Sequence, residues 1–236
     1  AVKINSVINT LLNTISATIL PRVSYYLGNG LKNEFQKLMQ TSVDILFMAA
    51  MPIAIGMMCV SDILIVVFSG PEFISGSLAA KILSVKLVFG AIDRVLAYQI
   101  CIPYKKDKEV LISTIAGAGF NLIANVILIQ FYGVTGAAVA TLLSEMIVFI
   151  VLTMYSRQVF EMRHLYKRMP IYFLASIWFF VVRWLLDRFA FNMLYELIFT
   201  VIICAIGYFV ILLIIRDPYL LEFIRGFFER VRRKKR

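Results

Sequence analysis

Charged and amide side chains interrupt an apolar segment near the middle of the chain. Residues 77–102 are rich in Ile, Leu, Val and Phe, yet they also contain Lys86, Asp93, Arg94 and Gln99. A charge at the centre of a bilayer costs about 2.5–3.5 kcal/mol on insertion scales, and such residues commonly mark a solute pathway. Two interpretations are open. These side chains line a pathway, or they neutralise charges elsewhere in the protein.

A second apolar segment supplies a possible partner for these cations. Glu145 is the only acid within residues 134–155. It could pair with Arg94 or Lys86, or it could carry protons or sodium ions.

Asparagines recur every four residues in two further segments. The first segment contains Asn5, Asn9 and Asn13, and a later one contains Asn121 and Asn125. Spacing of four keeps side chains on one face of a helix. Such a face either lines a wet cavity or makes hydrogen bonds to a neighbouring helix. We favour the cavity for the first segment and helix contacts for the second.

Composition indicates an integral membrane protein. The chain is 61% hydrophobic and 16% charged, with a mean hydropathy of +0.86, whereas soluble domains are about 45–50% apolar and about 25% charged. Apolar runs of about 20 residues recur, enough for a helix to cross a bilayer core. We predict an all-α, polytopic membrane bundle. Its seven expected spans are about 1–20, 42–68, 77–102, 110–131, 134–155, 170–187 and 194–215.

The expected spans form three regions. Residues 1–156 make a helical bundle, residues 157–215 add two helices, and residues 216–236 form a basic amphipathic tail. Because the chain starts at Ala1 and the first span is expected to start on the outer face, we expect this to be the C-terminal part of a longer protein.

Connections rich in Lys and Arg alternate along the chain with connections that are poor in them, and this alternation predicts how the protein is oriented in the membrane. Lysines and arginines gather in loops 21–41, 103–109 and 156–169 and in the tail. By the positive-inside rule, we expect these loops and the C-terminus to be cytoplasmic. We expect the membrane to be the plasma membrane. The net charge of +10 therefore needs no nucleic acid, and the final cluster at 230–236 suits anionic lipid headgroups.

No catalytic or metal-binding motif is present. There is no G-x-S-x-G, H-E-x-x-H or Walker A sequence. Cys59, Cys101 and Cys204 are scattered through apolar segments, and His164 is the single histidine, which disfavours both a disulfide framework and a zinc site. We expect neither an enzyme nor a cofactor. Close helix packing is instead favoured by the small residues Gly117, Gly136, Ala137, Ala138 and Ala140.

Several short sequences together resemble a known family. They are "ILPRVS" (19–24), "MPIAIG" (51–56), "FSGPEF" (68–73), "AYQICIPYKKDKE" (97–109) and "GAGFNLIANVILIQFYGVTGAAVATLLSE" (117–145). Over residues 1–155 the series resembles the C-terminal half of Wzx-type polysaccharide flippases. These belong to the multidrug/oligosaccharidyl-lipid/polysaccharide exporter superfamily. The resemblance implies two six-helix bundles, often with two extra helices. This chain would hold five helices of the second bundle and the extra pair, and the N-terminal bundle would be its partner.

The resemblance also implies a function. Such flippases move undecaprenyl-pyrophosphate-linked oligosaccharide repeat units to the outer leaflet for polysaccharide biosynthesis. Lys86 or Arg94 would meet the pyrophosphate or pair with acids of the other bundle, and the polysaccharide polymerase is a further implied partner. The alternatives are a lipid II flippase, a cation-coupled multidrug exporter, and a membrane enzyme of polysaccharide assembly. The candidate pathway residues are Asn5, Asn9, Asn13, Lys86, Asp93, Arg94, Gln99, Asn121, Asn125 and Glu145.

Overall fold

The computed structural model describes residues 20–162, 166–188, 192–222 and 225, and these residues form helices and turns with no strand. The predicted all-α fold is confirmed. Asn5, Asn9 and Asn13 lie outside the described residues. The elements are α2 (Leu20–Gly28), α3 (Lys32–Ser69), the 3-10 helix η1 (Pro71–Gly76), α4 (Ser77–Arg94), the π-helix η2 (Val95–Cys101), α5 (Asp107–Ser156), α6 (Met169–Leu186) and α7 (Met193–Ile214).

Five helical segments of the described chain are long and apolar enough to cross a membrane. They account for six of the expected spans, because α5 contains two. Its two arms are antiparallel and turn at Gly133, whose φ of 55° lies in the left-handed region that favours glycine. The sequence prediction had separated these arms at the same place, between residues 131 and 134.

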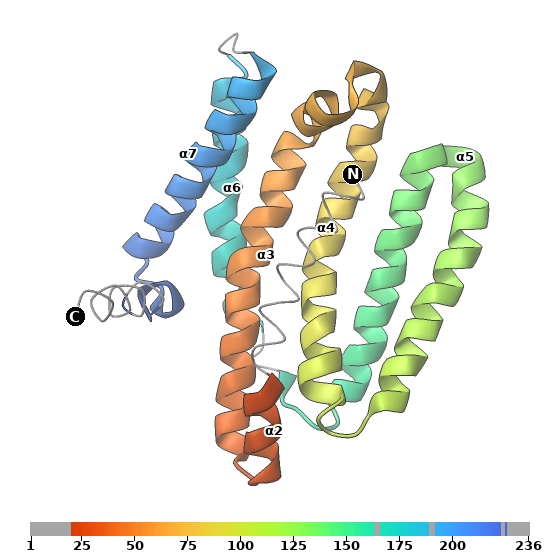
Figure 1. Cartoon of the computed structure of the whole chain (residues 1–236), viewed down its shortest axis with the longest axis vertical. Coiled ribbons are helices and arrows are strands. Elements are labelled where there is room, and N and C mark those ends of the chain that lie inside the picture. Colours follow the sequence, from red (N-terminus) through yellow and green to blue (C-terminus); the bar gives the residue numbers. More distant parts are fainter. Residues whose placement is uncertain (1–19, 163–165, 189–191, 223–224, 226–236) are drawn as a thin grey trace.

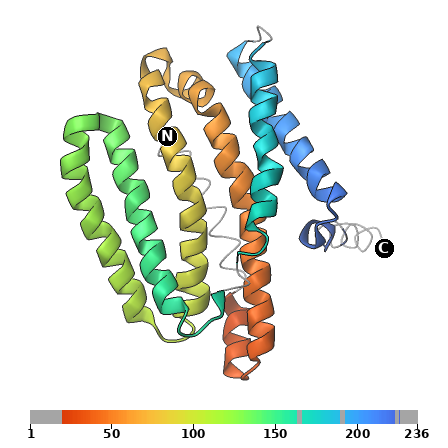
Figure 2. The same ribbon diagram turned by 180° about the vertical axis from the view of Figure 1, so that it is seen from behind.

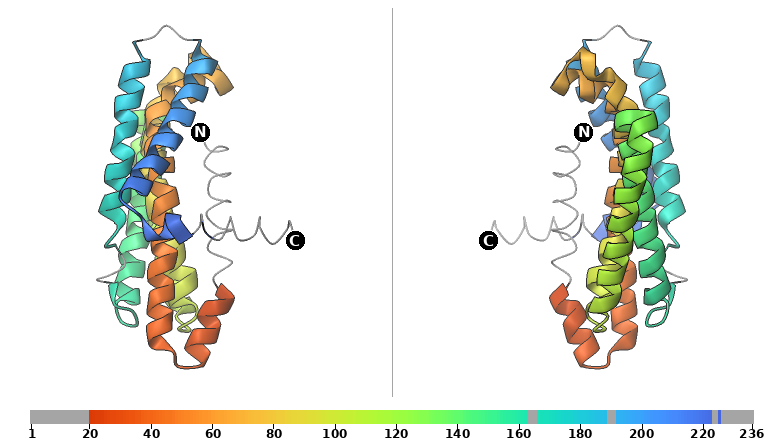
Figure 3. Two further views of the ribbon diagram at one scale, coloured as in Figure 1. Left: turned by 90° about the vertical axis from the view of Figure 1, so that its left-hand side faces the viewer. Right: turned by 90° about the vertical axis from the view of Figure 1, so that its right-hand side faces the viewer.

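The membrane-spanning helices stand side by side in a row (Figures 1 and 2). α6 and α7 pack on each other and on α3, α3 packs on α4, and α4 packs on α5. Viewed from the side, these helices make a thin layer (Figure 3). The α5 hairpin therefore forms one edge and the α6–α7 pair forms the other, with α3 and α4 between them.

One expectation is corrected: most of residues 21–41 are helical. α2 ends at Gly28, α3 begins at Lys32, and a short turn at 29–31 joins them. The 38 residues of α3 extend about 57 Å at 1.5 Å per residue, well beyond the bilayer core of about 30 Å. Its first turns project at the end where the basic loops gather (Figure 1). There Phe35 is buried against Tyr104 and Phe160, with ring centroids 5.6 and 5.9 Å apart. These apolar contacts hold the segment in helical form despite its charges.

Small residues bring the two arms of α5 together, as the sequence indicated. A Cβ atom on Gly117 would collide with Val148 of the second arm and lie 3.3 Å from the Ser144 carbonyl oxygen. A Cβ atom on Gly136 would collide with the Leu128 carbonyl. The hairpin is therefore tightly closed, and its second arm presents Glu145 towards α4.

Candidate functional site

Lys86 and Glu145 form an ion pair between α4 and the second arm of α5. Lys86 Nζ lies 3.3 Å from Glu145 Oε2, and the side chains are only 26% and 24% exposed. This is one of the pairings that the sequence suggested. Because both groups lie within membrane-spanning helices, each lowers the cost of holding the other there.

Gly90 provides the space that brings Glu145 close to α4. A Cβ atom at Gly90 would lie 2.7 Å from Glu145 Oε1 and 3.7 Å from Arg94 Nη2. The Glu145 carboxylate therefore lies over the glycine, between Lys86 one turn before it and Arg94 one turn after it. Arg94 is electrostatically coupled to both Glu145 and Asp93.

Asp93 is the least satisfied member of this group. Its side chain is 7% exposed, and neither carboxylate oxygen has a hydrogen-bond partner among the described residues. Asp93 is nevertheless coupled to the charges of Glu145, Arg94 and Lys86. We call Lys86, Asp93, Arg94 and Glu145 the α4–α5 charge cluster.

The charge cluster combines two cations with two carboxylates, so its formal charge is zero. Its cationic donors suit phosphate or carboxylate groups, but Glu145 already occupies Lys86. An incoming anion would therefore exchange with a carboxylate of the protein. No group of three or more His, Cys, Asp or Glu side chains within the described part of the chain could hold a metal ion.

The helix geometry changes directly after the charge cluster. α4 ends at Arg94, and the π-helix η2 follows at Val95–Cys101. Single π-helical turns within α-helices are frequent at functional sites. Gln99 lies in this turn, is fully buried, and accepts a hydrogen bond of 2.6 Å from Ser42 of α3. Gln99 thus joins η2 to α3, and it contributes to a different contact from the charge cluster.

The predicted asparagine pair of α5 makes a local contact. Asn125 Nδ2 donates to the backbone carbonyl and the side-chain oxygen of Asn121, at 2.8 and 2.9 Å. The donor and both acceptors belong to one helical arm, so these are not the expected hydrogen bonds to a neighbouring helix. The structure therefore brings together four of the predicted site residues and places Gln99, Asn121 and Asn125 in other contacts.

Sequence reasoning missed a second charged group, at the start of α6. Asp217 is 1% exposed, and its Oδ2 accepts from Arg168 Nη1 at 2.7 Å and from the Tyr172 hydroxyl at 3.2 Å. Its Oδ1 caps the helical turn after α7 by accepting from the backbone of Tyr219 and Leu220, at 3.0 and 3.1 Å. We call this the Arg168–Asp217 junction. An Asp-Pro pair, typical of a helix start, was the available signal.

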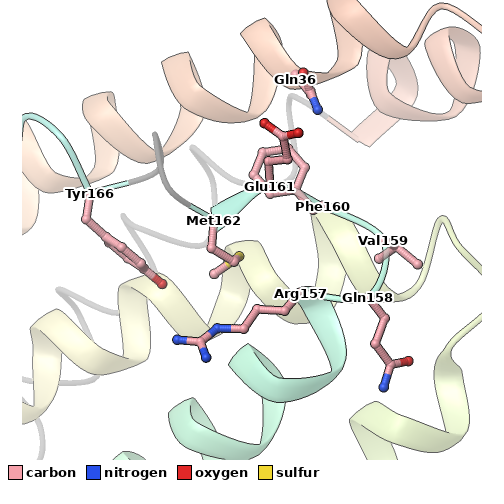
Figure 4. Close-up of a pocket in the computed structure, with 8 residues that line it drawn as sticks. All are labelled: Gln36, Arg157, Gln158, Val159, Phe160, Glu161, Met162 and Tyr166. Atoms are coloured by element: carbon pink, nitrogen blue, oxygen red, sulfur yellow. The ribbon is translucent and has the colours of Figure 1, made fainter.

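The chain also contains a sizeable cavity away from the charge cluster. This space of about 610 Å³ lies between α3 and the connection from α5 to α6. Figure 4 shows Gln36 of α3 on one side, with Arg157, Glu161 and Tyr166 from the connection around it. Burial raises the pKa of Tyr166 to about 12, so this phenol remains protonated at neutral pH. The lining contains both Arg157 and Glu161, and its polar side chains do not converge on one point, so the cavity indicates no particular ligand.

Comparison with known proteins identifies the family. The family model described as lipid II flippase MurJ matches residues 8–215. The chain belongs to this family. It is a family of flippases and not of enzymes, and together with the apolar helices it makes the chain part of a multi-pass membrane protein.

Two individual proteins are similar to the chain. The probable low-salt glycan biosynthesis flippase Agl15 of Haloferax volcanii is 26% identical over 130 residues, which is 55% of this chain and 27% of Agl15. A solved structure of lipid II flippase MurJ in an inward closed conformation matches with a TM-score of 0.68 and 21% identity. That match covers 87% of this chain and 44% of the MurJ chain. The chain thus spans less than half the length of either protein.

These findings confirm the predicted fold and place the chain in a family of lipid flippases. At 21% identity, the MurJ structure supports the fold alone. The Wzx-type branch that the sequence resembled is not distinguished from other flippases by these matches.

Proposed function

We propose that this chain is the C-terminal half of a flippase that moves a lipid-linked oligosaccharide from the cytoplasmic to the outer leaflet of the plasma membrane. The observation that carries the proposal is the family match over residues 8–215. The α4–α5 charge cluster adds a physical reason, because it places cations at membrane depth, where a phosphorylated headgroup must pass.

The charge cluster suits a transient anion better than a permanent one. Bare hydrocarbon rejects a headgroup of sugars and phosphate, whereas cations in a protein-lined cavity lower that barrier. Lys86 is held by Glu145 at 3.3 Å and keeps about a quarter of its side chain exposed. A pyrophosphate would displace Glu145 from Lys86 and Arg94, and Glu145 would take them back when the substrate leaves. Binding and release then exchange one anionic partner of Lys86 and Arg94 for another, so neither cation is left without an anion in the membrane.

Alternating access requires a second bundle facing this one. In transporters built from repeats, substrate sites lie near the bilayer midplane at the repeat interface. We infer that the N-terminal bundle of the full-length protein supplies the other wall. The predicted cavity residues Asn5, Asn9 and Asn13 would contribute amides to sugar hydroxyls. We further infer that the basic loops, which share one end of the row (Figure 1), face the cytoplasm.

Two substrates of one chemical class are candidates. The family description favours lipid II, whereas the similarity to a glycan biosynthesis flippase favours an oligosaccharide repeat unit of a polysaccharide. Both are saccharides on a polyprenyl phosphate carrier.

Complementation separates the two candidates. The full-length gene would be expressed in one strain depleted of its lipid II flippase and in another deleted for its repeat-unit flippase. Survival of the first strain indicates lipid II, and restored surface polymer in the second indicates a repeat unit. Failure in both strains, with increased drug efflux, would show that the protein is a multidrug exporter.

Substitutions in α4 then test the charge cluster in the complemented strain. We expect Lys86→Ala and Arg94→Ala to abolish complementation at normal membrane abundance. Lys81→Ala is the matched control, because Lys81 lies on the same helix but pairs with Asp62 of α3 at 2.8 Å. A fall in abundance that accounts for the lost complementation would instead assign the cluster a structural role.

A further inference from the structure

A second cavity lies beside the Arg168–Asp217 junction. This space of about 470 Å³ is enclosed by the first turns of α3, the start of α6 and the segment after α7. The side chains that matter for the argument are Lys37, Gln40, Thr41, Lys167, Arg168 and Tyr219. All are polar and three are cationic, and none of the described lining residues is an acid.

The junction fixes one of these cations in place. Arg168 Nη1 lies 2.7 Å from Asp217 Oδ2, and its guanidinium carbon lies 5.3 Å from the centroid of the Tyr219 ring. Arg168 is therefore held on two sides at the wall of the cavity. Lys37 and Lys167 are exposed, so their flexible side chains can close over a ligand.

The acids near the cavity cancel only part of its positive charge. Asp217 neutralises Arg168 behind the wall, and Asp44 is completely buried next to the Tyr219 hydroxyl, so the net positive charge comes from the exposed Lys37 and Lys167. Glu34 is 3.4 Å from Lys37, but both side chains are mostly exposed, where water weakens the pair. Burial and Asp44 raise the pKa of Tyr219 to about 12, so its hydroxyl remains a hydrogen-bond donor.

The cavity lies at the depth of lipid headgroups. The 18 residues of α6 extend about 27 Å, close to the bilayer core of about 30 Å. At the far end of α6, the guanidinium carbon of Arg188 lies 3.9 Å from the centroid of the Trp184 ring. Tryptophan is enriched at membrane interfaces. The near end, where the cavity opens, therefore meets the opposite interface. From there the exposed side chains of Phe173, Leu174 and Ile177 continue along α6.

We propose that this cavity binds the phosphate headgroup of an anionic phospholipid. Arg168 provides guanidinium donors held in place by Asp217, Lys37 and Lys167 provide mobile positive charges, and the acyl chains follow the exposed apolar face of α6. Because Tyr219 belongs to the segment after α7, a bound lipid joins that segment to α3 and α6. This site is separate from the α4–α5 charge cluster and independent of which substrate is transported.

Lipid-dependent thermal unfolding of the purified full-length protein in mild detergent tests the site. We expect phosphatidylglycerol to raise Tm more than phosphatidylcholine does. In Lys37→Gln/Lys167→Gln, the phosphatidylglycerol concentration for half of the effect should rise about tenfold or more, since each basic residue adds attraction to an anionic headgroup. Both lysines are exposed, so the variant should fold. Lys105→Gln/Lys108→Gln removes the same charge from exposed positions outside the cavity, and should respond as the wild type does.

Three results would overturn the proposal. The first is an unchanged response in the cavity variant. The second is an equal loss in both double variants, which would indicate diffuse attraction to basic loops. The third is equal stabilisation by inorganic phosphate alone, which would indicate a soluble anion as the ligand. None of these readouts depends on transport, so they are distinct from failure of the proposed function.

Discussion

Two aspartates near arginines have very different surroundings in this molecule. Asp217, at the start of the tail, receives four hydrogen bonds through its two carboxylate oxygens. Asp93, in the last turn of α4, receives none from the described residues, although Arg94 is adjacent in sequence. Both carboxylates are buried, at 1% and 7% exposure.

The difference separates a structural role from a functional one. Buried polar groups are normally hydrogen-bonded, so each exception calls for an explanation. The Arg168–Asp217 junction satisfies its carboxylate completely and joins α6 to the tail. The α4–α5 charge cluster leaves Asp93 available to a group that the described residues do not supply. We interpret the first as a structural anchor and the second as part of the proposed pathway.

Asp217→Asn should have the largest effect on stability. The substitution leaves Arg168 without its charged partner, and breaking a buried pair in this way costs about 3–5 kcal/mol. Chemical or thermal unfolding of the full-length protein measures this. Asp187→Asn is the control, because Asp187 pairs with Arg183 at 2.7 Å but is half exposed, and surface pairs contribute at most about 1 kcal/mol. Equal stability of the two variants would show that the junction is no anchor.

Gly117→Ala should have the next largest effect. The new methyl group would press on Val148 and the Ser144 carbonyl, next to Glu145, and overpacking of this kind costs about 1–3 kcal/mol. Gly119→Ala is the control on the same arm, since nothing lies within 4 Å of a Cβ atom there. Transport should fall with Gly117→Ala because Glu145 is displaced from Lys86. If both alanine variants have wild-type stability and transport, the closely packed arms do not position the cluster.

Ser42→Ala should have a smaller effect. It removes the 2.6 Å hydrogen bond to Gln99, and a typical hydrogen bond contributes about 1 kcal/mol. Ser84→Ala serves as the control, because Ser84 is equally buried but donates only to a carbonyl of its own helix. The difference in Tm between the two variants reports the strength of the contact between α3 and η2. A larger loss in Ser84→Ala would contradict this assignment.

The sequence predicted the parts of the fold that depend on local pattern. Apolar runs located the spans, Gly133 marked the turn of α5, and Glu145 was correctly suggested as a partner for Lys86. These features follow from hydropathy, from glycine at positive φ, and from the cost of an unpaired charge in a membrane.

Other features depend on contacts between distant residues. The first turns of α3 are helical because Phe35 packs on Tyr104 and Phe160. Both partners are far away in the sequence, so the charged residues around Phe35 suggested a loop. Arg168 and Asp217 are 49 residues apart, so neither neighbourhood in the sequence reveals the other. Gln99 was assigned to the pathway group because it is a polar residue in an apolar segment. Its hydrogen bond to Ser42 joins residues 57 positions apart, and such a contact leaves no local signal in the sequence.

We interpret Asp93 as serving transport and Asp217 as serving stability. The most direct measurement is Asp93→Asn in the full-length protein, with complementation, membrane abundance and Tm recorded together and Asp217→Asn alongside. We expect Asp93→Asn to keep its abundance and Tm but fail to complement, and Asp217→Asn to lose both Tm and abundance. An Asp93→Asn protein that complements fully, or one whose lost complementation follows from a fall in Tm and abundance, would contradict it.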